Sequence, residues 1–141
     1  MKTKLTGKFL LALTIFSLMG QVAWVVENMY FNVFIYKMFN ATPGDISLMV
    51  SASAIAATVT TVFMGALSDK VGKRKLFICL GYILWGVSIF SFTLLREDVI
   101  SATFPLASSA AAIGISLTII LDCVMTFFGS TANDAAFNAW L

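Results

Sequence analysis

The chain contains 141 residues, of which 60% are hydrophobic and only 11% are charged, and its formal net charge is +2. A water-soluble domain of this length needs a charged surface, so the composition excludes that class and predicts a protein embedded in a lipid bilayer. Histidine, the commonest general base and metal ligand, is absent from the sequence, and no Gly-rich phosphate-binding loop occurs. We therefore expect no enzyme, no resident metal or cofactor, and no nucleic-acid partner.

The first predicted element is a membrane helix over residues 9–36. Its charge-free run from Phe9 to Val26 is longer than the apolar core of a typical secretory signal, and no small-residue cleavage site follows near Gly20. A strand of a transmembrane β-barrel alternates in polarity every second residue over roughly ten residues, whereas the apolar runs of this chain are apolar on every side. We therefore expect helices that span the membrane.

Three further membrane helices are predicted over residues 46–68, 76–95 and 113–139. Each contains an apolar run near the roughly 20 residues that a helix rising about 1.5 Å per residue needs to cross the hydrocarbon layer. The last run is free of charge from Val99, but Pro105 and a string of small residues precede Ile113 and favour a start there. This register places Asp122, Thr126, Ser130 and Asn133 or Asp134, followed by Phe137, along one face at steps of three and four residues. We expect that face to border a cavity or a neighbouring helix.

The cysteines and tryptophans have simple expected roles. Cys79 and Cys123 are predicted to pack as small side chains and not to form a disulfide or a metal site. Trp85 and Trp140 are predicted to anchor helices at the lipid interface, whereas Trp24 is predicted to stack on a substrate ring.

The charged residues are distributed unevenly over the predicted loops. Lys37 and Asp45 fall in the first loop, around Pro43, and the third loop carries the sequence "RED" at residues 96–98. Seven of the nine basic residues lie in the N-terminal segment or the second loop, namely Lys2, Lys4, Lys8, Lys70, Lys73, Arg74 and Lys75. The positive-inside rule makes that side cytoplasmic. We therefore predict a multi-pass protein of the cell membrane with its N-terminus in the cytoplasm.

The second loop carries the most informative motif, "GALSDKVGKRK" at residues 65–75. A glycine near a helix end lets another backbone approach closely, and a second glycine permits a turn. An aspartate can accept hydrogen bonds from the N-terminus of a neighbouring helix, where the helix dipole is positive. The constrained positions of the motif are Gly65, Leu67, Asp69, Gly72, Lys73 and Arg74.

This motif, at this place between the second and third helices, resembles the cytoplasmic loop signature of the major facilitator superfamily. The resemblance implies an all-α membrane fold whose four helices are the first four of a twelve-helix transporter built from inverted three-helix repeats. It also implies that Asp69 and the basic residues form a charge relay that controls conformational switching; a loop that only sets topology is the alternative. With four helices, residues 1–141 are expected to be a partial N-terminal bundle of a truncated chain that needs the missing C-terminal helices of the same transporter.

The polar sequence "STANDAAFNAW" in the fourth helix is similar, more narrowly, to the glycoside–pentoside–hexuronide cation symporters, the melibiose-type branch of the same superfamily. That resemblance implies that Asp134 helps to bind the coupling cation. The second helix departs from the pattern of this branch because residues 46–68 contain no acidic residue. The coupling ion, H⁺ or Na⁺, therefore stays open.

A small polar cluster occurs twice in the chain. "ENMYFN" at residues 27–32 and "NDAAFN" at residues 133–138 each contain a polar pair and then Phe-Asn, with two residues between them. The first and fourth helices correspond in inverted repeats, so both clusters are predicted to line one central site. An acidic residue at the centre of a membrane helix costs about 2.5–3.5 kcal/mol on insertion scales and therefore usually faces an interior. The candidate substrate- or cation-binding residues are Asp134, Asn133, Asn138, Glu27, Asn28, Asn32, Asp122 and Trp24.

These expectations lead to one favoured function and to alternatives. We predict a secondary active transporter that takes up a sugar or a similar small solute by alternating access, coupled to a cation or a proton. Efflux of drug-like solutes by the same fold is the first alternative. A four-helix membrane protein that binds partner helices without transport is the second, and a dimerising four-helix exporter with a first-helix glutamate is disfavoured by the charge asymmetry and the loop motif.

Overall fold

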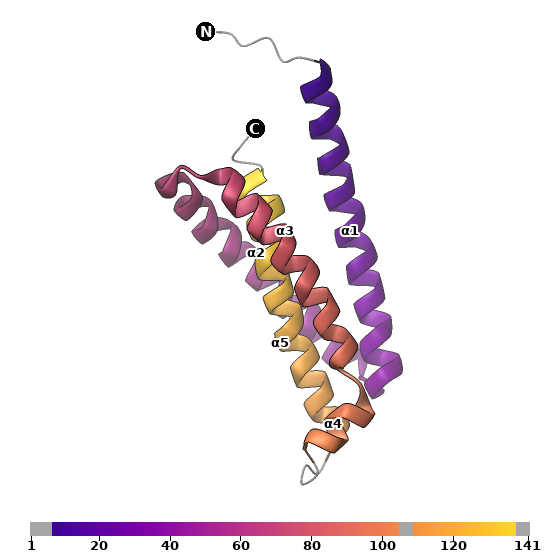
Figure 1. Cartoon of the computed structure of the whole chain (residues 1–141). Coiled ribbons are helices and arrows are strands. Elements are labelled where there is room, and N and C mark those ends of the chain that lie inside the picture. Colours follow the sequence, from indigo (N-terminus) through magenta and orange to yellow (C-terminus); the bar gives the residue numbers. More distant parts are fainter. Residues whose placement is uncertain (1–6, 105–108, 138–141) are drawn as a thin grey trace. The chain divides into compact units, whose positions relative to one another are not determined.

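The computed structural model describes residues 7–104 and 109–137, and these residues form helices joined by short connections, with no strand among them. In chain order the elements are α1 (Gly7–Phe39), α2 (Pro43–Val71), α3 (Arg74–Ser91), the 3₁₀ turn η1 (Phe92–Leu94), α4 (Glu97–Thr103), α5 (Ala110–Ser130) and the π-helical segment η2 (Thr131–Phe137) (Figure 1). Four helical stretches are long and apolar enough to cross a membrane: Leu10–Phe39, Pro43–Val71, Arg74–Leu94 and Ala110–Ala135. The predicted all-α fold with four membrane helices is confirmed.

The chain consists of two units, and the boundary between them falls within α1, between Val33 and Phe34. Residues 7–33 of the first unit form a single helix whose large apolar side chains, such as Leu11 and Met29, are exposed. The second unit begins with the last turn and a half of α1 and contains all the later elements.

The first connection is shorter than predicted. Lys37 lies in the last turn of α1 and not in a loop, and Asn40 ends that helix with a positive φ of 50°. Pro43 is already the first residue of α2, because Thr42 and Asp45 form a capping box. The Thr42 N–H donates to Asp45 Oδ2 at 2.8 Å, and the Asp45 N–H donates to Thr42 Oγ1 at 3.3 Å. Asp45 therefore belongs to the helix and not to the predicted loop.

The second connection reduces to two residues, because α2 continues to Val71 and α3 begins at Arg74. Gly72 adopts the left-handed conformation with φ of 68°, and its N–H donates to the Ser68 carbonyl oxygen at 2.9 Å. Glycine is suited to this helix end because it has no Cβ to clash at positive φ. The predicted loop is thus mostly helix, and only its glycine turn is irregular.

The third connection contains a short helix that the sequence pattern did not predict. Glu97 and Asp98, assigned to a loop, form the first turn of α4, where acidic side chains favour the positive end of the helix dipole. The next helix, α5, begins at Ala110 and so three residues earlier than the predicted start at Ile113. Ser109 sets this start, since its side chain accepts a hydrogen bond from the Ala112 N–H at 3.2 Å.

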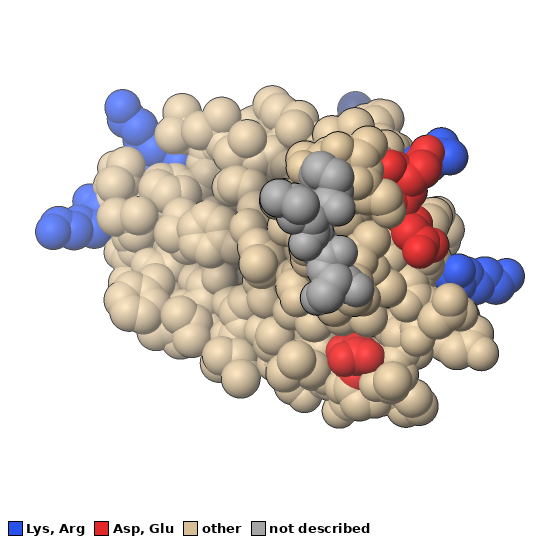
Figure 2. All heavy atoms as spheres, turned by 90° about the horizontal axis from the view of Figure 1, so that it is seen from below, with Lys and Arg blue, Asp and Glu red and all other residues tan. Residues whose placement is uncertain are grey.

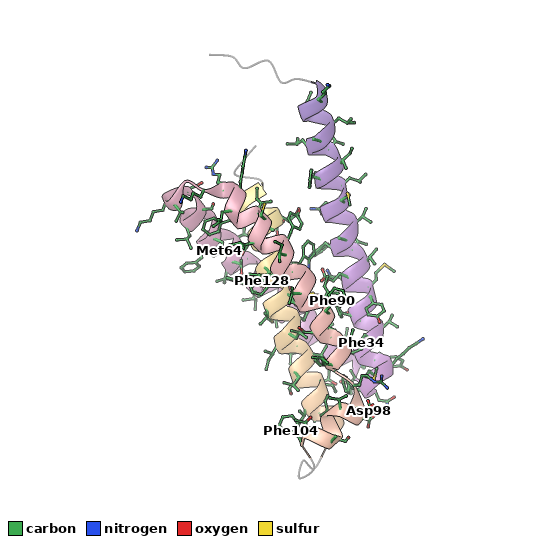
Figure 3. All side chains as sticks on the ribbon, viewed as in Figure 1. Phe34, Met64, Phe90, Asp98, Phe104 and Phe128 are labelled. Atoms are coloured by element: carbon green, nitrogen blue, oxygen red, sulfur yellow. The ribbon has the colours of Figure 1, made fainter. Side chains whose placement is uncertain are left out.

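Within the second unit, α5 and η2 pack against both α2 and α3 (Figure 1). Small residues allow this close packing: a Cβ added to Gly81 of α3 would lie 2.7 Å from the Ala132 Cβ. Much of the interface is lined by buried small polar residues, namely Ser53, Thr60, Ser68, Ser88, Thr118, Ser130 and Thr131. At one end, Phe34 lies edge-on to Phe92, with ring centroids 6.2 Å apart (Figure 3).

The predicted interfacial role of Trp85 is wrong. This side chain is only 7% exposed, its ring stacks on Tyr82 with centroids 5.8 Å apart, and it lies over Gly129 of α5, which has no side chain to exclude it. Trp140 lies outside the described residues. Both cysteines are free, Cys123 half-buried and Cys79 exposed, so Cys79 does not pack among the described residues as predicted.

The surface of the described residues is largely apolar. In Figure 2 most of the visible face is neither basic nor acidic, and the few charged side chains stand mostly near its edges. Large side chains such as Phe63 and Phe90 are more than two-thirds exposed. Such a surface is stable next to lipid or further membrane helices and not next to water.

Candidate functional site

Asp122 of α5 is the most buried acidic side chain of the second unit, with 7% exposure. Its Oδ2 accepts a hydrogen bond from the hydroxyl of Ser53, which is itself buried and belongs to α2. The other buried hydroxyl nearby along α5, that of Thr118, donates to the Gly114 carbonyl oxygen of its own helix at 2.7 Å. Ser53 is therefore the side chain that connects Asp122 to another helix.

The charge environment of Asp122 is unusual for a membrane carboxyl. Two ion pairs of the second unit are Asp69–Arg74 and Asp98–Arg96, and neither includes Asp122. A carboxylate inside a membrane helix costs about 2.5–3.5 kcal/mol on insertion scales, and one serine hydroxyl offsets only part of that cost. An acid held in this way can bind a proton or a small cation, which is the chemistry expected of a coupling site.

A second polar position lies where α5 changes to the π-helical segment η2 at Thr131. The Tyr82 hydroxyl of α3 donates to Asn133 Oδ1 at 3.3 Å, and Asn133 Nδ2 donates to Asp134 Oδ1 at 3.3 Å. Asn133 and Asp134 are half-buried. Single π-helical turns inside α-helices occur frequently at functional sites. In this segment Asn133 and Asp134 are a pair of candidate ligands, and Tyr82 of α3 supports Asn133.

The two polar positions of the fourth span are separate. Asp122 and Asp134 are twelve residues apart in the sequence, which corresponds to about 18 Å along an α-helix. Asp122 is bonded to α2, whereas Asn133 is bonded to α3. The predicted polar face thus borders neighbouring helices at two of its residues, α2 at Asp122 and α3 at Asn133. The π-helical turn is wider than an α-helical turn and shifts the residues that follow it.

The candidates on α1 belong to the first unit. Trp24 is 53% exposed, and its carbonyl oxygen accepts a hydrogen bond from Asn28 Nδ2 at 2.8 Å. Glu27 is buried, and Asn32 Oδ1 is buried without a hydrogen-bond partner among the described residues. Asp122 and Asp134 belong to the second unit, and the meeting of the α1 residues with them in one central site stays a prediction. Asn138 lies outside the described residues.

The loop motif forms a local cluster at the turn between α2 and α3. Asp69 does not accept bonds from the N-terminus of a neighbouring helix among the described residues; instead its Oδ1 accepts from Arg74 Nε at 3.0 Å and from Arg74 Nη2 at 2.5 Å. A Cβ at Gly65 would meet nothing within 4 Å, so the predicted close approach of another backbone is not found in the part of the chain that the structure describes. Leu67 and Lys73 are exposed. The role of this cluster in switching stays a prediction.

Two residues of these sites were not singled out from the sequence. The second helix contains several serines and threonines, and the sequence gives no reason to prefer Ser53 among them. Only the folded unit distinguishes it, because Ser53 is buried whereas Ser51 is exposed. Tyr82 is a hydroxyl-bearing aromatic residue within an apolar run, which is the one sequence signal that could have marked it. Neither residue has a spacing motif that would reveal its partner.

Comparison with known proteins places these features in a family context. The family model of the Major Facilitator Superfamily matches residues 6–138. The quinolone resistance protein NorA of several Staphylococcus aureus strains is 37% identical over 79 residues, covering 45% of this chain and 20% of NorA. The match therefore spans about a fifth of the length of that relative. No solved structure matches the chain significantly.

Proposed function

The chain belongs to the major facilitator superfamily, and from that premise we propose that it is the N-terminal part of a secondary active transporter that exports amphipathic, drug-like solutes in exchange for protons. It is a multi-pass membrane protein of a transporter family and not an enzyme. Since the match to NorA covers 20% of that protein, we propose that the described bundle works together with further helices of the same transporter.

The direction of transport is proposed from the named relative. NorA is described as a quinolone resistance protein, and resistance to a drug is the expected result of exporting it. This similarity supports the efflux alternative over uptake of a sugar. The resemblance of the fourth helix to melibiose-type symporters, and with it sugar uptake by symport, has no support from the relatives named here and stays a prediction.

The single observation that carries the proposed coupling is the buried hydrogen bond between Ser53 and Asp122. In the proposal, a deprotonated Asp122 accepts this bond and links α5 to α2. Protonation removes the charge and weakens the bond, because hydrogen bonds to a charged acceptor are roughly twice as strong as neutral ones. Binding and release of a proton at Asp122 would thus change how tightly the two helices are held together.

The proposed orientation follows from charge. The turn between α2 and α3 carries Lys70, Lys73, Arg74 and Lys75, and the positive-inside rule supports a cytoplasmic location for this turn and for the N-terminus. Asp122, on the long helix α5, then lies within the membrane, between the two aqueous phases that a coupled proton must connect.

The test is drug export by cells that express the whole protein carrying this chain. We expect energised cells to extrude a fluorescent quinolone or ethidium, and Asp122→Asn to abolish proton-driven export while the protein is still inserted in the membrane. Asp98→Asn, the same substitution at an exposed carboxyl of α4, is the matched control and should retain export. Uptake of labelled melibiose without drug export would contradict the proposal and favour the sugar prediction.

A further inference from the structure

Three phenylalanine rings meet at the end of the second unit that lies opposite the turn between α2 and α3. Phe34 and Phe39 come from the last turns of α1, and Phe92 follows the last residue of α3. The Phe34 ring lies edge-on to each of the other two, with ring centroids 6.2 Å apart in both pairs. Phe39 and Phe92 are buried, and Figure 3 places Phe34 toward the same end of the unit as α4. The aromatic cluster of Phe34, Phe39 and Phe92 thus lies at the end of the unit where α5 begins.

One ring of this cluster, that of Phe39, fits against a glycine of α5. A Cβ added to Gly114 would overlap the Phe39 ring, at 2.5 Å from Cδ1 and 2.6 Å from Cζ. Carbon atoms that are not bonded to each other are in contact at about 3.5–4.0 Å, so a larger residue cannot replace Gly114 unless the ring moves. Phe39 is only 2% exposed. Its ring therefore lies directly on the backbone of α5, in the second turn of that helix.

The face of α5 that carries Gly114 leads to the proposed proton site. Gly114, Thr118 and Asp122 follow one another at steps of four residues, and all three are buried. Residues at this spacing lie above one another on a helix, and eight residues of α-helix span about 12 Å. The Thr118 hydroxyl donates to the Gly114 carbonyl oxygen at 2.7 Å. Two small residues thus separate the Phe39 ring from the Asp122 carboxyl along this face.

The order of these residues indicates a route for protons. In the proposed orientation the aromatic cluster lies at the outer side of the membrane, because α1 runs outward from a cytoplasmic N-terminus. Water on this face would find polar partners in Thr118 and Asp122, as buried water requires, whereas an apolar constriction excludes water. We propose that Phe39, seated on Gly114, is a hydrophobic gate that closes Asp122 to the outer aqueous phase. This inference rests on the proposed function, which supplies the orientation and the proton.

The gate can be tested by the access of a water-soluble reagent. In the whole protein carrying this chain, with its native cysteines replaced by serine, Thr118→Cys places one thiol between Gly114 and Asp122. A membrane-impermeant cationic methanethiosulfonate is added outside intact cells, and the rate at which it modifies this thiol is measured. We expect modification to be about ten-fold faster when Phe39→Ala is added, because the closed arrangement loses its buried ring and its contact with Phe34, and the open one becomes more populated.

Two further variants separate a gate from general loosening of the bundle. Phe90→Ala removes the same ring from a side chain of α3 that is 76% exposed, and it should leave the rate of modification unchanged. Gly114→Ala keeps the Phe39 ring but adds the Cβ that overlaps it, so it should displace the ring and also speed the modification. Gly114→Ala thus tests the same contact from the α5 side, without truncating any side chain.

An unchanged rate in both Phe39→Ala and Gly114→Ala would overturn the proposal, and so would an equal acceleration by Phe90→Ala. The rate of modification does not depend on export, so the gate and the proposed function can fail separately. Fast modification in Phe39→Ala without any drug export would support the gate and contradict the proposed function. Export that depends on Asp122, together with no effect of Phe39→Ala on the rate, would contradict the gate alone.

Discussion

The hydroxyl of Ser53 in α2 donates a hydrogen bond to the carboxylate of Asp122 in α5, and both side chains are buried. The two residues are 69 positions apart in the sequence, and their bond links the second and fourth membrane helices. Hydrogen bonds between membrane helices contribute on average about 0.6 kcal/mol and at most about 1.7 kcal/mol. The bond is thus strong enough to stabilise one arrangement of the helices and weak enough to be broken during transport.

Replacing Ser53 by alanine should destabilise the bundle by about 1–3 kcal/mol, because the Asp122 carboxylate stays buried and loses its hydrogen-bond donor. Unfolding of the purified chain in mixed detergent micelles measures this change. Ser51→Ala is the matched control, since the Ser51 hydroxyl is exposed and donates to the Ser47 carbonyl oxygen of its own helix at 2.7 Å. Equal destabilisation by both substitutions would show that the bond to Asp122 does not hold the helices together.

Two glycines of α3 should respond in opposite ways to alanine. A Cβ at Gly81 would lie 2.7 Å from the Ala132 Cβ and 3.1 Å from the Ala132 backbone nitrogen, so Gly81→Ala should push α3 away from η2 and cost about 1–3 kcal/mol. A Cβ at Gly86 would meet nothing within 4 Å, so Gly86→Ala should be neutral or stabilise the helix by up to about 1 kcal/mol. Melting temperatures of the two variants check the contrast; a stable Gly81→Ala variant would contradict the close packing of α3 on η2.

Gly72 should be hard to replace at the end of α2. Its φ of 68° costs an ordinary L-residue about 1–2 kcal/mol, so Gly72→Ala should lower the free energy of unfolding by that amount. Gly72→Asn should cost less, because asparagine tolerates the left-handed region better than alanine. If the melting temperatures of the two variants do not follow this order, the turn has a different backbone conformation in the membrane.

The tryptophans should differ in their access to lipid. Trp85 is 7% exposed and Trp24 is 53% exposed. In single-tryptophan variants reconstituted with brominated lipids, the fluorescence of Trp24 should be quenched strongly and that of Trp85 only weakly. Strong quenching of Trp85 would contradict its packing over Gly129, and protection of Trp24 in the whole transporter would instead support its predicted place beside a substrate.

The sequence alone determined the class of the protein and the positions of its spans. An apolar run near 20 residues is long enough to cross the bilayer as a helix. It forms a helix in lipid because a helix satisfies its own backbone hydrogen bonds, which lipid cannot do. The local signals at the helix ends were also present: Thr42 with Asp45, Gly72, and Ser109 each act on residues within four positions. A prediction based on the apolar runs alone does not include these end signals, so it places Lys37, Asp45, Glu97 and Asp98 in loops.

Only the tertiary structure decided which polar and aromatic residues meet. The bond from Ser53 to Asp122, the bond from Tyr82 to Asn133 and the burial of Trp85 over Gly129 all join different helices. Such contacts depend on how the helices rotate and how closely they approach. In a membrane, packing sets both of these and a hydrophobic pattern does not, because lipid tails are as apolar as the side chains between the helices. The π-helical turn at Thr131 also shifts the residues after it away from the regular helical period, so the face that carries Asp134 could not be located by counting along the sequence.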